Sequence, residues 1–217
     1  PLDAKQVVGA YCIEPAGRSM AEVVQRLNEL HRLKDQPLLL REVSARLFWG
    51  MSKVLDGRQR LVAAVLGQSE CPFPESPIQL LVQLPVSELL GVLFVENQMS
   101  FEQAARSGSA RLDGFALAYA SGFKGSAQRL RSPGSASVYY SLRGAVSSDC
   151  RVTFESWLYA KAEGLPAYFW GDLDWSGMGI LRALRMSFAN MQAWPGGYSP
   201  MLQSLLGGQG HAPNEAD

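Results

Sequence analysis

Two aspartates, Asp172 and Asp174, stand one residue apart in the segment YFWGDLDWSG, residues 168–177. Side chains two positions apart lie on the same face of an extended chain, so we expect the two carboxylates to lie side by side at a strand end. Two negative charges at that distance repel each other and raise the pKa of one of them unless a cation neutralises the pair. The spacing therefore predicts a bound metal ion or a neighbouring lysine or arginine, or else carboxylates that only cap a helix or face water.

A third carboxylate, Glu96, follows the apolar segment GVLFV, which has the composition of a short buried strand. In parallel α/β sheets the functional groups gather at the carboxyl ends of the strands. If the two strands are neighbours, Glu96, Asp172 and Asp174 converge on one point without a histidine or a cysteine. Ligation by oxygen alone favours a hard cation, Mg²⁺ or Mn²⁺, and Mg²⁺ commonly joins carboxylates to phosphate groups. The predicted substrate class is therefore phosphate-bearing.

Strands and helices alternate from about residue 91 onward, which predicts an α/β domain with a mainly parallel sheet. Gly171 and Gly177 flank the aspartates, and we expect Gly177 to let the chain turn tightly into the next helix. The predicted strands are 91–97, 114–122, 166–174 and 189–194. The predicted helices are 100–108, capped by Ser100, then 153–164 and 176–188, with a further helix opening after residue 122; segment 131–150 is hard to assign.

The first 77 residues have a helical pattern that predicts a separate region. Three helices are expected over 19–34, 39–48 and 57–67, and Ser19 with Glu22 fits a capping box at the start of the first. Three short helices with tight breaks are typical of a helix-turn-helix or winged-helix unit that binds DNA. The proline-rich segment 68–77 is the predicted linker to a domain over 78–206, and 207–217 is a predicted flexible tail.

Basic residues in both regions are candidate DNA contacts. In the helical region these are Arg41, Arg46 and Lys53, although solvated side chains on amphipathic helices have the same spacing. In the α/β region Lys124 lies in a glycine-containing loop that lacks the GxxxxGK[ST] pattern of a P-loop. Arg182 and Arg185 stand three residues apart on the helix over 176–188 and either contact DNA backbone or face solvent.

The composition limits the class of protein and of partner. The chain has 217 residues and zero formal net charge, so its overall charge does not indicate a nucleic-acid partner. Three isolated cysteines and only two histidines argue against a zinc site or a disulfide framework and favour a reducing cytoplasm. No apolar stretch reaches the roughly 18 residues of a membrane-spanning helix, and no signal peptide is visible. Because the chain opens with Pro1 instead of Met, we expect a fragment or a processed product.

Together these residues resemble a Toprim domain, the metal-binding α/β module of topoisomerases, primases and related nucleases. The segment VLFVEN supplies Glu96, and GDLDWSG fits the DxDxxG pattern at Asp172, Asp174 and Gly177. More narrowly, FVENQMSF and YFWGDLDWSGMGILRALR are similar to the C-terminal domain of the nuclease subunit (JetD) of Wadjet systems. Those are SMC-type bacterial complexes that cut closed-circular plasmid DNA. The upstream LREVSARLFWGMSKVLDG is also similar to that family, so the resemblance covers roughly residues 38–202.

The resemblance implies a cytoplasmic DNA endonuclease subunit that depends on Mg²⁺ or Mn²⁺ and acts on double-stranded DNA. It also implies a homodimer that assembles with SMC-type subunits, has no membrane partner and could be inactive as an isolated fragment. Glu96, Asp172 and Asp174 would then hold the metal and serve in catalysis, with hydrolysis by a metal-activated water.

Three alternatives stay open at this point. The first is a non-catalytic DNA-binding or assembly subunit that keeps the Toprim fold as a scaffold. The second is tyrosine transesterification, because the family is related to the topoisomerase VI A subunit, in which a winged-helix domain carries a nucleophilic tyrosine. Tyr11 is the only tyrosine before Glu96 and lies outside the helix-turn-helix candidate, which argues against this chemistry. The third is a phosphohydrolase acting on a small molecule, which predicts a closed apolar pocket.

Overall fold

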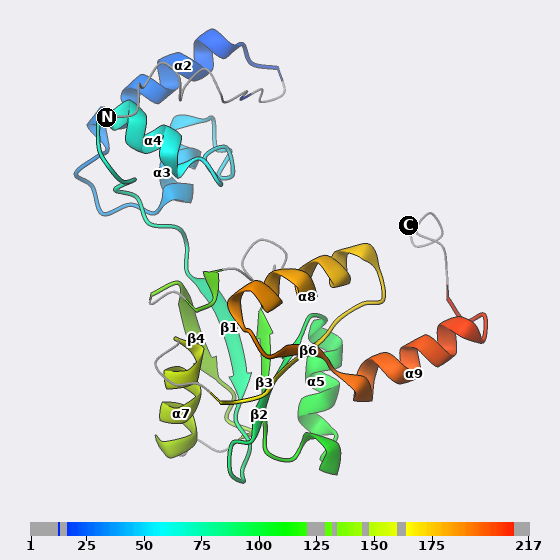
Figure 1. The fold of residues 1–217 in the computed structure, drawn as a ribbon. Coiled ribbons are helices and arrows are strands. Elements are labelled where there is room, and N and C mark those ends of the chain that lie inside the picture. Colours follow the sequence, from blue (N-terminus) through cyan, green and yellow to red (C-terminus); the bar gives the residue numbers. More distant parts are fainter. Residues whose placement is uncertain are drawn as a thin grey trace. The chain divides into compact units, whose positions relative to one another are not determined.

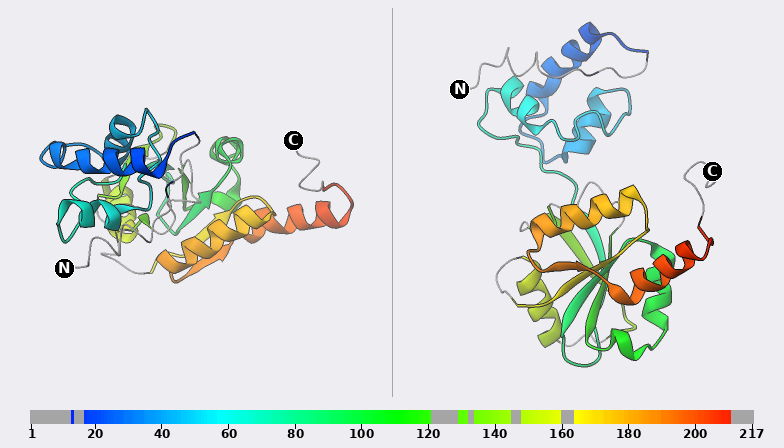
Figure 2. Two further views of the ribbon diagram at one scale, coloured as in Figure 1. Left: turned by 90° about the horizontal axis from the view of Figure 1, so that it is seen from above. Right: turned by 45° about the vertical axis from the view of Figure 1, so that its right-hand side comes forward.

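The computed structural model describes residues 13, 17–120, 129–131, 134–144, 148–159 and 164–210. The chain divides into two units, Pro1–Ser76 and Pro77–Asp217, which Figures 1 and 2 show as ribbons. This division falls at the end of the proline-rich segment 68–77. Within the described residues, no helix combines the length and the apolar character needed to cross a membrane.

The first unit is helical in the part that the structure describes. Its elements are α2 (Met20–Asn28), the 3-10 helix η1 (Glu29–Arg32), α3 (Leu40–Leu47) and α4 (Gln59–Leu66). The predicted capping box is present, since the Ser19 hydroxyl accepts the backbone N–H of Glu22 and the Glu22 carboxylate accepts the N–H of Ser19 at 2.8 Å. The predicted helix 19–34 was too long, because the chain tightens into η1 after Asn28. Residues 17–76 contain no strand, so the described part of this unit shows no wing.

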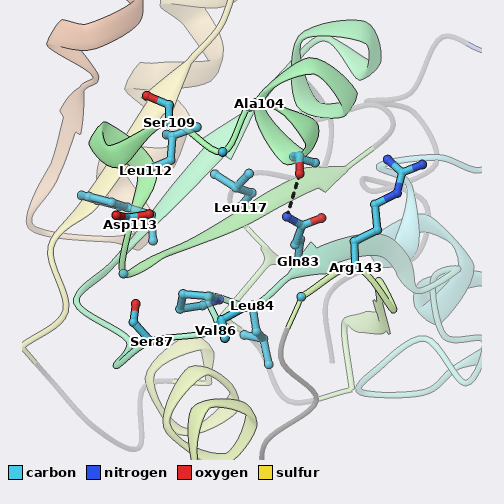
Figure 3. A pocket seen from close by; sticks show the side chains of 16 residues that line it. Gln83, Leu84, Val86, Ser87, Ala104, Ser109, Leu112, Asp113, Leu117 and Arg143 are labelled. Carbon is cyan, nitrogen blue, oxygen red and sulfur yellow. Dashed lines mark hydrogen bonds between the residues drawn. The ribbon is translucent and has the colours of Figure 1, made fainter.

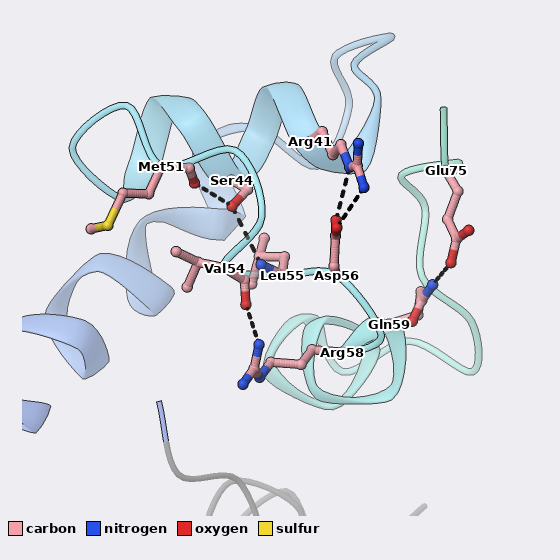
Figure 4. Close-up of polar contacts among 9 residues, drawn as sticks. All are labelled: Arg41, Ser44, Met51, Val54, Leu55, Asp56, Arg58, Gln59 and Glu75. Atoms are coloured by element: carbon pink, nitrogen blue, oxygen red, sulfur yellow. Dashed lines mark hydrogen bonds and ion pairs between the residues drawn. The ribbon is translucent and has the colours of Figure 1, made fainter. Parts of the chain in front are cut away.

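The apolar faces of these helices form one core, which holds the turns between them in place. Leu30, Val43 and Val62, from η1, α3 and α4, are fully buried there. Ser44 is the buried polar residue of this core: its hydroxyl donates to the carbonyl of Met51 at 2.7 Å and accepts the N–H of Leu55 at 3.3 Å (Figure 4). These two bonds fix the connection between α3 and α4.

The second unit is an α/β structure built on a six-stranded sheet (Figure 1). Its strands are β1 (Ile78–Gln83), β2 (Gly91–Val95), β3 (Phe115–Ala120), β4 (Ala136–Tyr140), β5 (Ala167–Trp170) and β6 (Met191–Ala193). Their order across the sheet is β4-β1-β3-β2-β5-β6. β3, β2, β5 and β6 are mutually parallel, whereas β1 is antiparallel to β3 and parallel to β4. The predicted α/β class with a mainly parallel sheet is confirmed.

Helices cover both faces of this sheet, which explains why β2 is apolar at every position. Val92 and Phe94 belong to the core cluster that includes α7 (Ser148–Leu158) and α8 (Trp175–Ser187), whereas Leu93 and Val95 join the cluster around α5 (Gln98–Arg106). Successive side chains point to opposite faces of a strand, so a strand covered on both sides buries all of them. The remaining elements are the 3-10 helix η2 (Ala110–Leu112) and α9 (Pro195–Leu206), which follows β6.

Several element boundaries differ from those predicted. α5 begins at Gln98 because the Asn97 side chain, and not Ser100, caps it by accepting the N–H groups of Met99 and Ser100. The strand predicted over 166–174 ends at Trp170.

Four elements, β1, η2, β4 and α9, were not predicted at all. The helix predicted after residue 122, the end of the helix predicted over 153–164 and the last part of the predicted tail lie wholly or partly outside the described residues.

Candidate metal centre

β2 and β5 are neighbouring parallel strands, and their pairing brings the predicted acidic residues to the same edge of the sheet. Val95 pairs with Trp170, and one residue further the Glu96 N–H donates to the Trp170 carbonyl at 2.9 Å. The Glu96 carboxylate lies against the loop between β5 and α8, where its Oε2 accepts the backbone N–H of Asp172 at 3.3 Å. Two residues that are 76 positions apart in the sequence are therefore in direct contact.

Gly171 gives the Glu96 carboxylate the space that it occupies. A β-carbon on Gly171 would overlap Glu96 Oε2 and would lie only 2.6 Å from the ring of Phe169. The backbone of Gly171 is not in the left-handed region, so the requirement for glycine here is steric and not conformational. Any larger residue would displace the glutamate or the strand end.

Asp174 has a structural role that the sequence left open as an alternative. It is the N-cap of α8: its backbone is extended, with φ −128° and ψ 176°, and its Oδ1 accepts the N–H of Gly177 at 2.6 Å. Both aspartates thus lie in the loop between β5 and α8 and not on the strand itself. Gly177 lies inside the first helical turn, where a β-carbon would overlap the carbonyl of Asp172. Close packing therefore explains the glycine at this position. The prediction that Gly177 permits a tight turn was wrong.

Glu96 holds its proton more tightly than an ordinary glutamate does. The pKa of Glu96 is raised, first by burial and then by the charges of Asp172 and Asp174, while the hydrogen bond from the Asp172 N–H opposes the shift. Among the described residues no arginine or lysine forms a salt bridge with any of the three. The cluster therefore carries negative charge that the described part of the chain does not compensate, and a cation would relieve it.

The donor atoms of this cluster fit a hard cation. Glu96 Oε2 and Asp174 Oδ1 each accept one backbone N–H, which orients the side chain and leaves its second oxygen without a hydrogen bond in the described structure. Asp172 is exposed, and neither of its carboxylate oxygens is hydrogen-bonded to a described residue. Oxygen ligands with room for several waters suit Mg²⁺ or Mn²⁺. No three His, Cys, Asp or Glu side chains among the described residues form a closed metal-binding group, so the aspartates would have to rotate around a bound ion.

Tyr198 is a residue of this site that sequence reasoning missed. Its hydroxyl accepts the N–H of Gly171 at 3.1 Å, so it holds the turn between Trp170 and Asp172. The pKa of Tyr198 is raised, chiefly by burial, and the three nearby carboxylates raise it further. Tyr198 lies in the first turn of α9, which packs on the end of β5 where a β-carbon on Gly197 would press on the Trp170 ring. Because α9 was not predicted, no sequence signal pointed to this tyrosine.

The three residues of the first unit that were predicted to contact DNA differ in whether their charged groups already have a partner within the chain. Arg41 donates from Nε and Nη2 to the Asp56 carboxylate at 3.1 and 2.7 Å, and this pair raises the pKa of Arg41 (Figure 4). Arg46 is exposed and donates to the Gln36 amide oxygen at 3.2 Å. Lys53 is exposed, and its side chain makes no hydrogen bond or ion pair to the described residues. Lys53 thus offers the most available charge of the three.

In the second unit, α8 carries two of the predicted contacts. Arg182 and Arg185 are both exposed, and Arg185 Nε donates to the Met191 carbonyl at 3.2 Å. Lys124 lies outside the described residues, as does Tyr11. Both arginines lie on the helix that Asp174 caps, but Arg185 contacts Met191, which starts β6 and pairs with the start of β5. Arg185 therefore lies near the amino ends of these strands, at the opposite edge of the sheet from the acidic cluster.

A cavity of about 500 Å³ opens at the other edge of the sheet (Figure 3). It is lined by Gln83 at the end of β1, by Phe115 at the start of β3 and by Leu112 and Arg143. Gln83 donates through Nε2 to the Ala105 carbonyl at 3.1 Å. None of the three acidic residues lines this cavity. They lie instead on an open surface, where residues 172–175 are all exposed.

Comparison with known proteins adds no family. No protein-family model matches the chain, and no curated protein matches it. The function therefore has to be inferred from the fold and from the contacts of the acidic residues.

Proposed function

We propose that this chain is a metal-dependent DNA endonuclease subunit in which Glu96, Asp172 and Asp174 hold Mg²⁺ or Mn²⁺. The observation that carries the proposal is the contact between Glu96 Oε2 and the N–H of Asp172, which joins the ends of two adjacent parallel strands. It places Glu96 among two further carboxylates in a cluster without an ion-pair partner in the described part of the chain. Uncompensated carboxylates around a partly buried glutamate with a raised pKa are typical of functional sites, where a cation or a reaction uses the charge.

The residues of the site have separable tasks. A bound divalent cation would supply charge neutralisation at the scissile phosphate and activation of water. The Glu96 carboxylate fits into the space that Gly171 leaves free and accepts the Asp172 N–H. The Gly177 N–H orients Asp174. Asp172 is exposed and free to turn toward a ligand. The open surface favours a polymer as substrate over a small molecule enclosed in a pocket.

The wider assignment rests on the resemblance to the Wadjet nuclease subunit. We propose a Toprim-type domain in a bacterial SMC-type plasmid-defence complex, acting in the cytoplasm as a homodimer on double-stranded DNA. Lys53, Arg46 and Arg182 are exposed, which supports contacts to DNA phosphates that position the duplex without reading its sequence.

Two observations favour a non-catalytic scaffold as the second candidate. Asp174 already serves as a helix cap, and the carboxylates are not closed around a metal position in the described structure. In that case the chain would bind DNA or partner subunits, and no divalent cation would bind at the acidic cluster. The two candidates therefore differ in one measurable property, the affinity for Mg²⁺ or Mn²⁺.

The test is cleavage of supercoiled plasmid in Mg²⁺ or Mn²⁺ by the parent chain and by Asp172→Asn. This variant removes one charge from an exposed side chain that makes no hydrogen bond to the described residues, so the fold should be unchanged. Asp113→Asn, an exposed acid at the other edge of the sheet, is the matched control. The proposal expects cleavage that is lost in Asp172→Asn and kept in Asp113→Asn. Equal cleavage by the parent chain and Asp172→Asn would contradict it.

A further inference from the structure

The start of α8 exposes a large aromatic side chain directly beside the acidic cluster. Trp175 follows Asp174 in the sequence and is 92% exposed. Leu173 and Met178 on either side of it are also exposed large hydrophobic residues. A single exposed apolar side chain is ordinary, but an aromatic group this exposed is uncommon and marks contact surfaces when others surround it. Packing within the described chain does not explain Trp175.

Gly179 is a second residue on this helix without a reason inside the described chain. Glycine destabilises a helix interior relative to alanine, so a glycine there needs a cause. A β-carbon on Gly179 would have no atom within 4 Å, and the backbone is not in the left-handed region. Gly177, two residues earlier, differs because a side chain there would overlap the carbonyl of Asp172. At Gly179 the missing side chain leaves open space at the surface of the helix, so that a body approaching from outside meets the backbone directly.

The charge of α8 indicates what kind of body that is. The helix contains Arg182 and Arg185 and has no acidic residue. Arg182 is exposed and forms no hydrogen bond or ion pair with the described residues. Trp175, Gly179 and Arg182 follow one another at steps of four and three, so they lie on one face of the helix. With a rise of 1.5 Å per residue, the face extends about 10 Å from Trp175 to Arg182, the length of a few nucleotides.

We infer that this face of α8 binds one strand of nucleic acid beside the acidic cluster, with Trp175 stacked on an unpaired base. Gly179 lets the strand approach the helix, and Arg182 neutralises one of its phosphates. An aromatic side chain that stacks on a base, together with a basic side chain that binds a phosphate, is the usual way in which proteins hold single strands, because every base offers a flat face. The inference rests on the proposed function and narrows its substrate to DNA with an unpaired stretch next to the cut. In an intact duplex the base faces are stacked on one another and unavailable to an indole ring.

The test is the fluorescence anisotropy of a labelled 20-nucleotide oligothymidine, titrated with the full chain at low salt in the presence of a chelator. Trp175→Ala should weaken binding by about 5- to 150-fold, the range for loss of one aromatic stacking platform. Gly179→Ala should also weaken binding while raising Tm, a pair of opposite effects that a merely structural glycine would not produce. Leu142→Ala, which truncates a side chain that is 91% exposed on another part of the unit, is the control and should change neither.

Two results would overturn the inference. One is equal affinity of the parent chain, Trp175→Ala and Gly179→Ala for the oligonucleotide, including the case in which none of them binds it. The other is concentration-dependent self-association of the parent chain that Trp175→Ala abolishes, which would show that a second copy covers this face. Because the titration contains no divalent cation, no cleavage can occur in it, and metal binding and cleavage test the proposed function in separate experiments.

Discussion

The carboxylate of Glu96 occupies the space in which Gly171 would otherwise carry a side chain. The two residues continue the register of β2 and β5 beyond the last paired positions, Val95 and Trp170. The acidic site therefore depends on the absence of a β-carbon as much as on the presence of carboxylates. A substitution of this glycine tests the geometry without removing any charge.

Gly171→Ala should displace Glu96 and weaken Mn²⁺ binding, although all three carboxylates remain. It should also lower the free energy of unfolding by about 1–3 kcal/mol, because the added methyl group overpacks a buried position. Calorimetric titration and thermal unfolding measure the two effects. Gly179→Ala is the matched control, since its methyl group enters open space and should leave Mn²⁺ affinity unchanged. If Gly171→Ala bound Mn²⁺ as the parent chain does, Glu96 would not be a ligand.

Substitutions of Asp174 separate its helix-capping role from metal binding. Asparagine caps helices as well as aspartate does, so Asp174→Asn should keep the stability of the parent chain while it loses metal affinity. Asp174→Ala should lose metal affinity and, in addition, about 1 kcal/mol of stability because the Gly177 N–H loses its acceptor. Thermal unfolding and Mn²⁺ titration of the two variants test this division. Equal Mn²⁺ affinity in Asp174→Asn and the parent chain would show that Asp174 caps α8 but does not bind the metal.

The raised pKa of Glu96 predicts how stability depends on pH in the absence of metal. A carboxyl group whose pKa is higher in the folded than in the unfolded chain binds its proton more tightly when folded. Its ionisation therefore lowers stability as pH rises from the ordinary value of 4.5 through the folded pKa. Glu96→Gln removes this charge and keeps an oxygen that can accept the Asp172 N–H. It should be more stable than the parent chain at pH 7 and equally stable below pH of about 4.

Addition of a divalent cation provides the control for the effect of the Glu96 charge on stability. Addition of Mg²⁺ at pH 7 should raise the Tm of the parent chain and should not raise that of Glu96→Gln, because binding to the folded state stabilises it. If the Tm values of the two proteins changed in parallel from pH 4 to pH 8, ionisation of Glu96 would not lower the stability of the folded chain.

Tyr198→Phe should loosen the turn that carries the aspartates. Without the hydroxyl, the buried N–H of Gly171 has lost its acceptor, which costs about 1–3 kcal/mol of stability. Because that turn connects Trp170 to Asp172, Mn²⁺ affinity should fall as well. Tyr168→Phe on β5 is the control, since its hydroxyl has no hydrogen bond to the described residues and should be dispensable. Unchanged Mn²⁺ affinity in Tyr198→Phe would remove Tyr198 from the metal site.

The sequence predicted the central strands well because burial on both faces makes them apolar throughout. β2 carries GVLFV and all five residues are buried, so a short apolar run between turn residues was sufficient. β1 and β4 lie at one side of the sheet and lack a continuous apolar run: β1 alternates buried positions with exposed or half-buried ones, and β4 has no buried position. α9 was missed because Pro195, two glycines and Pro200 give its sequence the appearance of a loop.

The candidate site was predicted as a set of residue types but not as a set of contacts. That Glu96 and Asp172 both follow strands could be inferred from apolar runs, whereas their contact depends on the adjacency of β2 and β5, which spacing alone does not determine. The sequence allowed a helix-capping role for Asp174 as one alternative, and the hydrogen bond from the Gly177 N–H shows that Asp174 has this role. Tyr198 could not be found, because its hydroxyl reaches Gly171 only through the packing of an unpredicted helix.

Whether the three carboxylates share one hard cation can be measured by calorimetric titration of the metal-free chain with Mn²⁺ at pH 7. We expect saturable binding by the parent chain that is strongly weakened in each of Glu96→Gln, Asp172→Asn and Asp174→Asn and unchanged in Asp113→Asn. Absence of saturable binding by the parent chain, or binding that survives all three substitutions, would contradict this expectation.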